Sequence, residues 1–198
     1  MTQPSFETKK PTVALGICGS FCTLDKTVPT IQALQKRGWN VQPVMSYETA
    51  SQDTRFGTAA YWRETIEKLT GNPILDTLTG VEPLGPKGMA DVMVIAPCTG
   101  TTLARLDMGL SDTPITLAAK SLLRIHRPIV LAVSTNDGLG ASAQHIGALL
   151  VRRDFYFVPF GQDDCIKKPM SLKADFTRIS DTLEEALHGR QIQPILVP

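Results

Sequence analysis

The sequence predicts an α/β fold built on a doubly wound parallel sheet, and two observations carry this prediction. Short apolar runs rich in strand-forming residues alternate along the chain with longer segments whose apolar residues recur at helical spacing. Two of the expected strands, 91–96 after its first residue Asp91 and 128–133, are continuously apolar, as strands are when helices cover both of their faces. Alternating strands and helices form parallel sheets, so we expect helices on both sides of this sheet.

Each element is expected from its periodicity and from the residues that close it. Gly38 suits the end of the first helix, because glycine readily adopts the left-handed conformation that often follows a helix. Pro83 and Pro86 indicate a loop at 80–88. The expected strands are 12–17, 39–45, 91–96, 128–133 and 155–160, and the expected helices are 27–37, 56–69, 101–109, 114–125, 142–153 and 175–188.

Length and composition limit the class of protein. A chain of 198 residues is long enough for one well-buried domain, which we expect at residues 11–198 after a polar tail at 1–10. Its 20 Lys and Arg residues nearly balance its 19 Asp and Glu residues, so we expect neither a nucleic-acid-binding arm nor a polybasic membrane surface. No apolar run approaches the ~20 residues of a membrane span, and the start of the chain does not resemble a signal peptide. These features favour a soluble, cytoplasmic protein.

The cysteines and histidines do not form a pattern that suggests a metal site. The chain has four cysteines and three histidines, without a CxxC or an HxxxH motif. No metal is therefore expected, and reduced thiols are favoured over disulfides. Cys98 is the one thiol expected beside the candidate site, although no neighbouring base is evident that would lower its pKa.

The turn after the first strand is the first candidate binding segment. It has the pattern Gly16-x-x-Gly19-Ser20, in which glycines allow close approach of a ligand and the serine offers a hydroxyl group. The third glycine of a GxGxxG motif is missing, as is an acidic residue after the second strand. A mononucleotide phosphate is therefore favoured over a dinucleotide, and a simple tight turn is the alternative.

Polar residues also follow the second, third and fourth long strands, and the carboxyl ends of parallel strands share one edge of a sheet. We therefore expect these turns to converge on one crevice, with hydroxyl groups and a glycine at a helix start that suit an anion. The residues concerned are Ser46, Pro97, Thr99, Gly100, Thr101, Thr102, Ser134 and Asn136.

The order and spacing of these turns resemble the flavoprotein family of flavin-dependent cysteine decarboxylases. The resemblance implies a three-layer Rossmann-like fold, assembly as trimers or multiples of trimers, and FMN bound at subunit interfaces. By position, Ser20 resembles the phosphate-binding serine, and Ser46 resembles the hydroxyl residue that faces the flavin. Two departures argue against decarboxylation: Thr101 stands where the family has asparagine, and segment 46–69 lacks the family's catalytic histidine.

Within that family, the whole chain resembles the second component of a two-component enzyme of endospore-forming bacteria that makes pyridine-2,6-dicarboxylate. The segments Arg55-Phe-Gly57 and Asp163-Asp-Cys-x-Lys-Lys-Pro-x-Ser171 carry this resemblance, together with the turns. It implies a partner, the A subunit, that binds NAD(P), and a place in the mother-cell cytoplasm during sporulation. Three alternatives stay open: FMN here takes part in the oxidation, this chain is a flavin-free partner that completes the site, or it only assembles and binds phosphate.

A dicarboxylate substrate requires cationic partners, and three basic residues are candidates. They are Arg105 in the helix after the third strand, Lys168 in an expected loop at 161–171, and Arg55. Each has a structural alternative, namely an ion pair of Arg105 with a nearby aspartate, a solvated loop at Lys168, and a loop salt bridge of Arg55. No catalytic residue is assigned.

Overall fold

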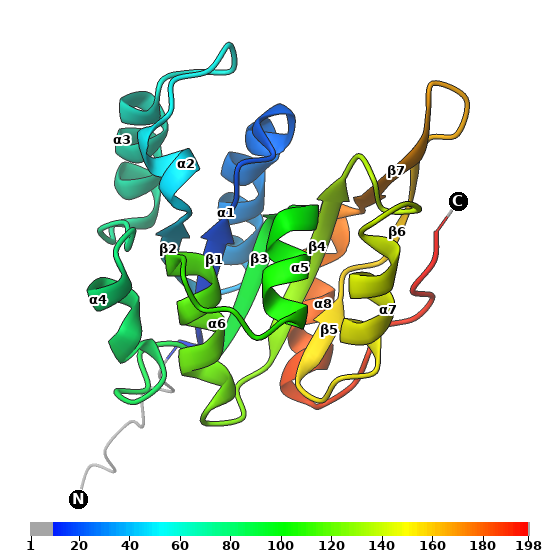
Figure 1. The fold of residues 1–198 in the computed structure, drawn as a ribbon. Helices are drawn as coiled ribbons and strands as arrows, with labels where there is room; N and C mark the ends of the chain where they lie inside the picture. The colour runs from blue at the N-terminus through cyan, green and yellow to red at the C-terminus, as the bar shows by residue number, and fades with distance from the viewer. Residues whose placement is uncertain (1–9, 198) are drawn as a thin grey trace, which may run out of the picture.

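The computed structural model describes residues 10–197, and the expected tail at 1–10 lies outside this part of the chain except for Lys10. Seven strands form one sheet in the order β2-β1-β3-β4-β7-β6, with β5 also paired to β4 (Figure 1). Strands β1 to β5 run parallel to one another, whereas β7 is antiparallel to both β4 and β6. The strands are β1 (Thr12–Ile17), β2 (Asn40–Met45), β3 (Val92–Cys98), β4 (Ile129–Thr135), β5 (Phe155–Phe157), β6 (Phe160–Asp164) and β7 (Lys168–Ala174).

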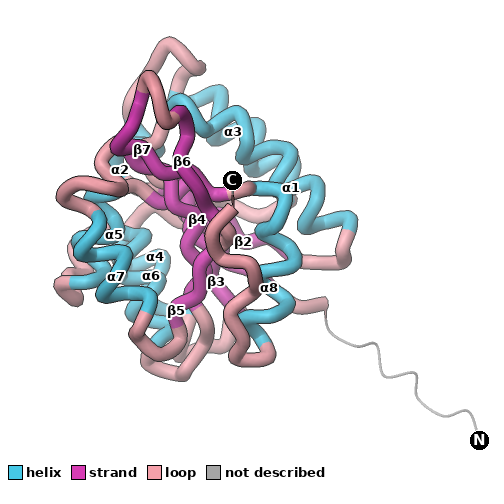
Figure 2. Tube along the Cα trace, turned by 90° about the vertical axis from the view of Figure 1, so that its right-hand side faces the viewer, coloured by secondary structure: helices cyan, strands magenta, loops and turns pink. Residues whose placement is uncertain are grey.

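Helices cover both faces of this sheet, as Figure 2 shows. One layer contains α1 (Thr27–Lys36), α3 (Ala59–Thr70) and α8 (Ile179–Leu187). The other contains α4 (Leu78–Val81), α5 (Gly100–Asp107), α6 (Pro114–Leu123) and α7 (Ala143–Leu150). The short helix α2 (Tyr47–Ser51) follows β2, and 3-10 turns lie at η1 (Phe21–Lys26), η2 (Glu82–Leu84) and η3 (Phe176–Arg178). No helix in residues 10–197 has the length and apolar character needed to span a membrane. The three-layer α/β prediction is confirmed.

Complete burial of the central strands explains their apolar sequences. Every residue of β1 and β3 is buried, because helices pack on both sides of them. At Gly16, a Cβ atom would lie 2.8 Å from Met93 Cε and 3.3 Å from Ile115 Cδ1. The glycine thus allows α6 and β3 to pack closely on β1. The expectation that Gly16 also brings the backbone close to a ligand stays a prediction.

The C-terminal third differs from the expected pattern. The strand expected at 155–160 is interrupted at Pro159, which has no N–H group for a ladder hydrogen bond. The chain then enters β6. The segment expected as a loop at 161–171 contains most of β6 and the first part of β7, which pair as an antiparallel hairpin. Its many exposed charged residues conceal the strand pattern in the sequence. The loop expected at 80–88 also contains structure, since the last residues of α4 and all of η2 lie within it.

Candidate functional site

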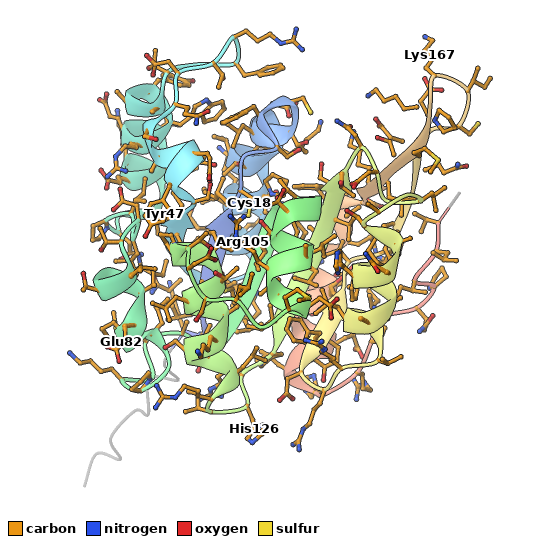
Figure 3. The ribbon with its side chains drawn as sticks, viewed as in Figure 1. Cys18, Tyr47, Glu82, Arg105, His126 and Lys167 are labelled. Carbon is orange, nitrogen blue, oxygen red and sulfur yellow. The ribbon has the colours of Figure 1, made fainter. Side chains whose placement is uncertain are left out.

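Two adjoining pockets form a crevice at the carboxyl ends of β1, β2, β3 and β4. The Cys18 pocket, of about 240 Å³, is lined among others by Cys18, Ser46 and Arg105. The Ser20 pocket, of about 460 Å³, is lined among others by Ser20 and by residues of the turn after β4 and the β6–β7 hairpin. Both pockets share Gly19, Phe21 and Thr99. Figure 3 shows Cys18 and Arg105 close together above the centre of the sheet. The expected convergence of the turns is therefore observed.

Three hydroxyl groups meet on one side of the Ser20 pocket. The Oγ atom of Ser20 lies 3.0 Å from Thr23 Oγ1 and 3.1 Å from Ser134 Oγ, and the latter two atoms are also 3.1 Å apart. A hydroxyl group donates one hydrogen bond and rotates freely, so all three protons can turn toward one anion. Thr23 was not a sequence candidate. Its spacing of three residues from Ser20, in the turn η1, was the only signal.

The turn after β3 uses its threonines for several different contacts. Thr99 is the N-cap of α5, and its hydroxyl accepts a hydrogen bond of 3.3 Å from the backbone N–H of Thr102. The Thr102 hydroxyl donates to Cys18 Sγ at 3.3 Å, whereas Thr101 is exposed and lines the Cys18 pocket. Helix capping therefore explains Thr99, and Thr101 has its side chain free to meet a ligand.

The thiols differ sharply in their environment. Burial raises the pKa of Cys18 to about 11, although the hydrogen bond from Thr102 acts in the opposite direction. Cys18 is therefore a neutral thiol at pH 7. Cys98 was expected beside the site, but its side chain is completely buried and lines neither pocket. Desolvation raises its pKa well above the ordinary value. The exposed thiol at the crevice is Cys22.

Gly100 and Pro97 shape the turn after β3 and do not line either pocket. A Cβ atom at Gly100 would lie 2.8 Å from Thr135 Oγ1 and 2.9 Å from Asp137 Oδ1, so no larger residue fits there without movement. The Asp137 carboxylate accepts hydrogen bonds from the hydroxyls of Thr135 and Ser142, and these bonds lower its pKa. Gly100 thus has a packing role, and the expectation that Gly100 and Pro97 contact a cofactor stays a prediction.

Ser46 and Asn136 lie on opposite sides of the crevice. Ser46 lines the Cys18 pocket and is the N-cap of α2, where its hydroxyl accepts a hydrogen bond of 3.3 Å from the backbone N–H of Thr49. Asn136 lines the Ser20 pocket, and its side-chain oxygen accepts a hydrogen bond of 3.2 Å from Ser171 of β7. The β6–β7 hairpin is therefore joined to the turn after β4 at the crevice.

The basic candidates occupy different places. Arg105 lines the Cys18 pocket and pairs with Asp112, whose Oδ1 is 3.3 Å from Arg105 Nε. Lys168 lines the Ser20 pocket, and its Nζ lies 2.7 Å from Asp163 Oδ2. This contact lowers the pKa of Asp163 and raises that of Lys168.

Two basic residues lie where the sequence did not predict them. Lys173 also lines the Ser20 pocket, with its Nζ 3.7 Å from Asp163 Oδ1. It was missed because the hairpin that brings it there was not recognised. Arg55 lines neither pocket, and its guanidinium group lies 4.8 Å from the centre of the Phe56 ring, on the loop between α2 and α3. The structure does not bring Arg55 to the crevice.

The hydroxyl groups and cations of the crevice suit an anionic ligand. Within residues 10–197, no group of three or more His, Cys, Asp and Glu side chains has a metal-binding arrangement. The crevice offers hydroxyl groups along its length and cations at both ends, and one carboxylate lines each pocket, Glu48 in the Cys18 pocket and Asp163 in the Ser20 pocket. Crevices at the carboxyl ends of parallel strands are the usual ligand sites of such sheets.

Residues 1–150 match the family model described as Flavoprotein. The chain belongs to the flavoprotein family. This flavoprotein is 43% identical over 185 residues to the dipicolinate synthase B subunit of Bacillus subtilis, an alignment that covers 93% of this chain and 92% of that protein. It therefore lies in the branch of the family that contains the dipicolinate synthase B subunits.

Solved structures agree with this placement. The dipicolinate synthase B subunit of Bacillus halodurans superposes on the flavoprotein with a TM-score of 0.87 and 38% identity, covering 95% of this chain and 96% of that one. The FMN-dependent cysteine decarboxylase SpaF has a TM-score of 0.68 and 22% identity, covering 89% and 97% of the two chains. At that identity, the second comparison shows a shared fold alone.

Proposed function

We propose that this flavoprotein is the B subunit of a dipicolinate synthase. It acts with a separate NAD(P)-binding A subunit to convert the product of dihydrodipicolinate synthase into pyridine-2,6-dicarboxylate. The observation that carries the proposal is 43% identity to a B subunit over almost the full length of both chains, crevice included. The reaction removes two electrons from the substrate ring, so an electron acceptor must lie beside it.

The donors in the crevice fit FMN. The hydroxyl groups of Ser20, Thr23 and Ser134 would hold its phosphate in the Ser20 pocket. Gly19 borders both pockets, and a Cβ atom there would make only ordinary contacts, so the backbone leaves room for a ligand that passes between them. When bound, FMN would supply a two-electron acceptor.

The chain's other crevice residues would position the flavin and the substrate. Ser46, Thr101 and Thr102 line the Cys18 pocket and would border the flavin. Arg105 and Lys168 would hold the substrate carboxylates, each by exchanging its present aspartate partner for the ligand. Cys18 stays neutral at pH 7, so it adds no negative charge to a site for anions.

A second candidate is a component without redox function that retains the crevice as a vestigial mononucleotide site. The observation that favours it is that Ser46 and Thr99 already bond to the backbone as helix caps. Under this alternative, the A subunit carries out the oxidation with its own NAD(P). An FMN-dependent decarboxylase is less well supported, since the segment from Ser46 to Leu69 contains no histidine.

The resemblance also suggests the setting in which the protein acts. We expect residues 11–198 to fold as one unit that assembles into trimers or multiples of trimers. We place the protein in the mother-cell cytoplasm of a sporulating bacterium.

An absorbance spectrum tests the flavin. The purified chain is incubated with FMN and freed of unbound dye, and bands near ~370 and ~450 nm are expected from bound oxidised flavin. The Ser20→Ala and Ser134→Ala variants should each retain less FMN. The matched control Ser51→Ala, on α2 with its hydroxyl bonded to Tyr47 O, should retain as much as the natural chain. A spectrum flat in this region would overturn the flavin proposal and favour the second candidate.

An assay with both components tests the pathway assignment separately. The purified A subunit, this chain, NAD(P)⁺ and freshly generated product of dihydrodipicolinate synthase should together form pyridine-2,6-dicarboxylate, detected by chromatography. Neither protein by itself should match the rate of the pair. Equal rates with and without this chain would contradict the proposed function.

A further inference from the structure

Among the described residues, Glu48 is the one carboxylate that lines the Cys18 pocket. It lies in α2, and Ser46 and Gln52, which cap the two ends of this short helix, line the same pocket. A Cβ atom at Gly19, which borders both pockets, would lie 3.7 Å from Glu48 Cβ. The side of α2 that carries Glu48 therefore forms one wall of the crevice. The FMN and substrate contacts of the proposed function do not use its carboxylate.

The two carboxylates of the crevice differ in their surroundings. In the part of the chain that the structure describes, no Lys, Arg or His side chain forms an ion pair with Glu48. Asp163, in contrast, pairs with Lys168 at 2.7 Å and with Lys173 at 3.7 Å. An ion pair stabilises the charged form of a carboxylate and so makes it a poorer proton acceptor. Glu48 is therefore the crevice carboxylate that is better able to take up a proton.

Of the described residues that line the Cys18 pocket, only Glu48 can serve as a base at neutral pH. Arg105 stays protonated, and the hydroxyl groups of the pocket are neutral. Burial is the main cause that raises the pKa of the Cys18 thiol to about 11, so this thiol holds its proton. The charge of Glu48 adds to this rise in pKa and that of Arg105 opposes it, so both charges lie near Cys18. The pocket thus combines a proton acceptor with a cation that suits a carboxylate.

We infer that Glu48 is a catalytic residue of the oxidation, namely the base that removes a proton from the substrate ring. This inference rests on the proposed function, and Arg105 would hold a substrate carboxylate so that a ring C–H group meets Glu48.

The dihydro ring carries two hydrogens more than pyridine-2,6-dicarboxylate. One C–H bond breaks with its proton passing to a Glu48 carboxylate oxygen, and its electron pair joins the aromatic ring. The other C–H bond breaks with its hydrogen and electron pair passing to the two-electron acceptor, a flavin or a nicotinamide. The products are the aromatic dicarboxylate, the reduced acceptor and protonated Glu48.

The assay of the assembled pair tests this base. Glu48→Gln keeps the size of the side chain but cannot accept the proton, so turnover should fall by about 100-fold or more with KM unchanged or lower. Calorimetry without an electron acceptor should show that the variant pair binds pyridine-2,6-dicarboxylate roughly two- to fivefold more tightly at low salt, because a charge that repels this dianion is gone. The matched control Glu64→Gln, an exposed glutamate on α3 that lines neither pocket, should match the natural chain in both measurements.

A second variant separates proton transfer from the shape of the pocket. Glu48→Ala leaves room for a small carboxylate, so added formate should raise its turnover by about tenfold and should not reactivate Arg105→Ala. The urea midpoint of each variant verifies that it is folded.

Each outcome decides the inference. Turnover of Glu48→Gln equal to that of the natural pair overturns the assignment of Glu48 and leaves the proposed function standing. Lower turnover with weaker product binding, and without reactivation of Glu48→Ala by formate, makes Glu48 a binding residue and also overturns the assignment. If the natural pair forms no pyridine-2,6-dicarboxylate, the inference and the proposed function both fail.

Discussion

The turn after β3 and the β6–β7 hairpin both border the crevice, but different interactions hold them in place. Gly100 packs tightly on the cluster of Thr135, Asp137 and Ser142, and Thr102 bonds to the buried Cys18. The hairpin, in contrast, holds its cations by ion pairs at the surface. Buried packing fixes a side chain strongly, whereas exposed ion pairs are weak and are screened by salt. The crevice thus combines fixed hydroxyl groups with adjustable cations.

The largest effect is expected from adding one methyl group at the turn. Gly100→Ala would force its Cβ into the Asp137 cluster and should lower the free energy of unfolding by about 2 kcal/mol, a typical cost of overpacking. The matched change Gly147→Ala, in α7, meets no atom within 4 Å and should leave stability unchanged or raise it by up to ~1 kcal/mol. Urea unfolding followed by circular dichroism measures both. Equal stability of the two variants would contradict the tight packing of the turn.

A smaller effect is expected when Asp137 loses its charge. Asp137→Asn should lower the free energy of unfolding by about 1 kcal/mol at pH 7, at the low end for charged hydrogen bonds because Asp137 is exposed and solvent screens its carboxylate. The folded-state pKa of Asp137 lies below its ordinary 3.8, so its contribution is complete above that value and falls as the pH drops through the lowered pKa. The difference in free energy of unfolding between the natural chain and the variant should therefore be constant from pH 7 to pH 5 and shrink below about pH 4. A difference that instead widened on acidification would refute this role.

The smallest stability effect is expected from the same substitution in the hairpin. Asp163→Asn removes an exposed ion-pair partner, so the urea midpoint at pH 7 should not change measurably. The change also frees Lys168 and Lys173 to meet an anion. Binding of inorganic phosphate, measured by calorimetry, should therefore strengthen by roughly two- to fivefold at low salt, and less at high salt. A destabilisation as large as that of Asp137→Asn would show that the hairpin and the turn after β3 are stabilised by their polar contacts to the same extent.

The sequence alone predicted the parallel strands of the sheet and the convergence of the polar turns. Continuous apolar runs within 91–96 and 128–133 indicated strands buried on both faces, and the structure has β3 and β4 at these positions. Parallel strands end at one edge of a sheet, so the turns at Ser20, Thr99 and Ser134 had to meet. This part of the prediction was secure because it depends on periodicity and connectivity, which are local or topological properties.

The tertiary structure decided which residues of those turns face the crevice. Gly16, Pro97 and Gly100 belong to the same motifs as Gly19 and Thr101, yet only the latter two line a pocket. A motif gives the order of residues along the chain, whereas their direction depends on what packs against them.

The hairpin is the clearest case of tertiary control. Its sequence is polar, and nothing local distinguishes it from a loop. It becomes a strand pair because Ser134 and Thr135 at the end of β4 offer backbone groups to Lys173 and Leu172 of β7. That pairing brings Lys173 to the Ser20 pocket, which the sequence could not reveal. The sequence by itself thus determined the fold, the family and the location of the crevice, because these follow from periodicity, motif order and strand direction. The structure alone determined the hydroxyl cluster with Thr23, because it depends on contacts between residues more than 100 positions apart, and the place of Lys173, because it depends on the pairing of β7 with β4.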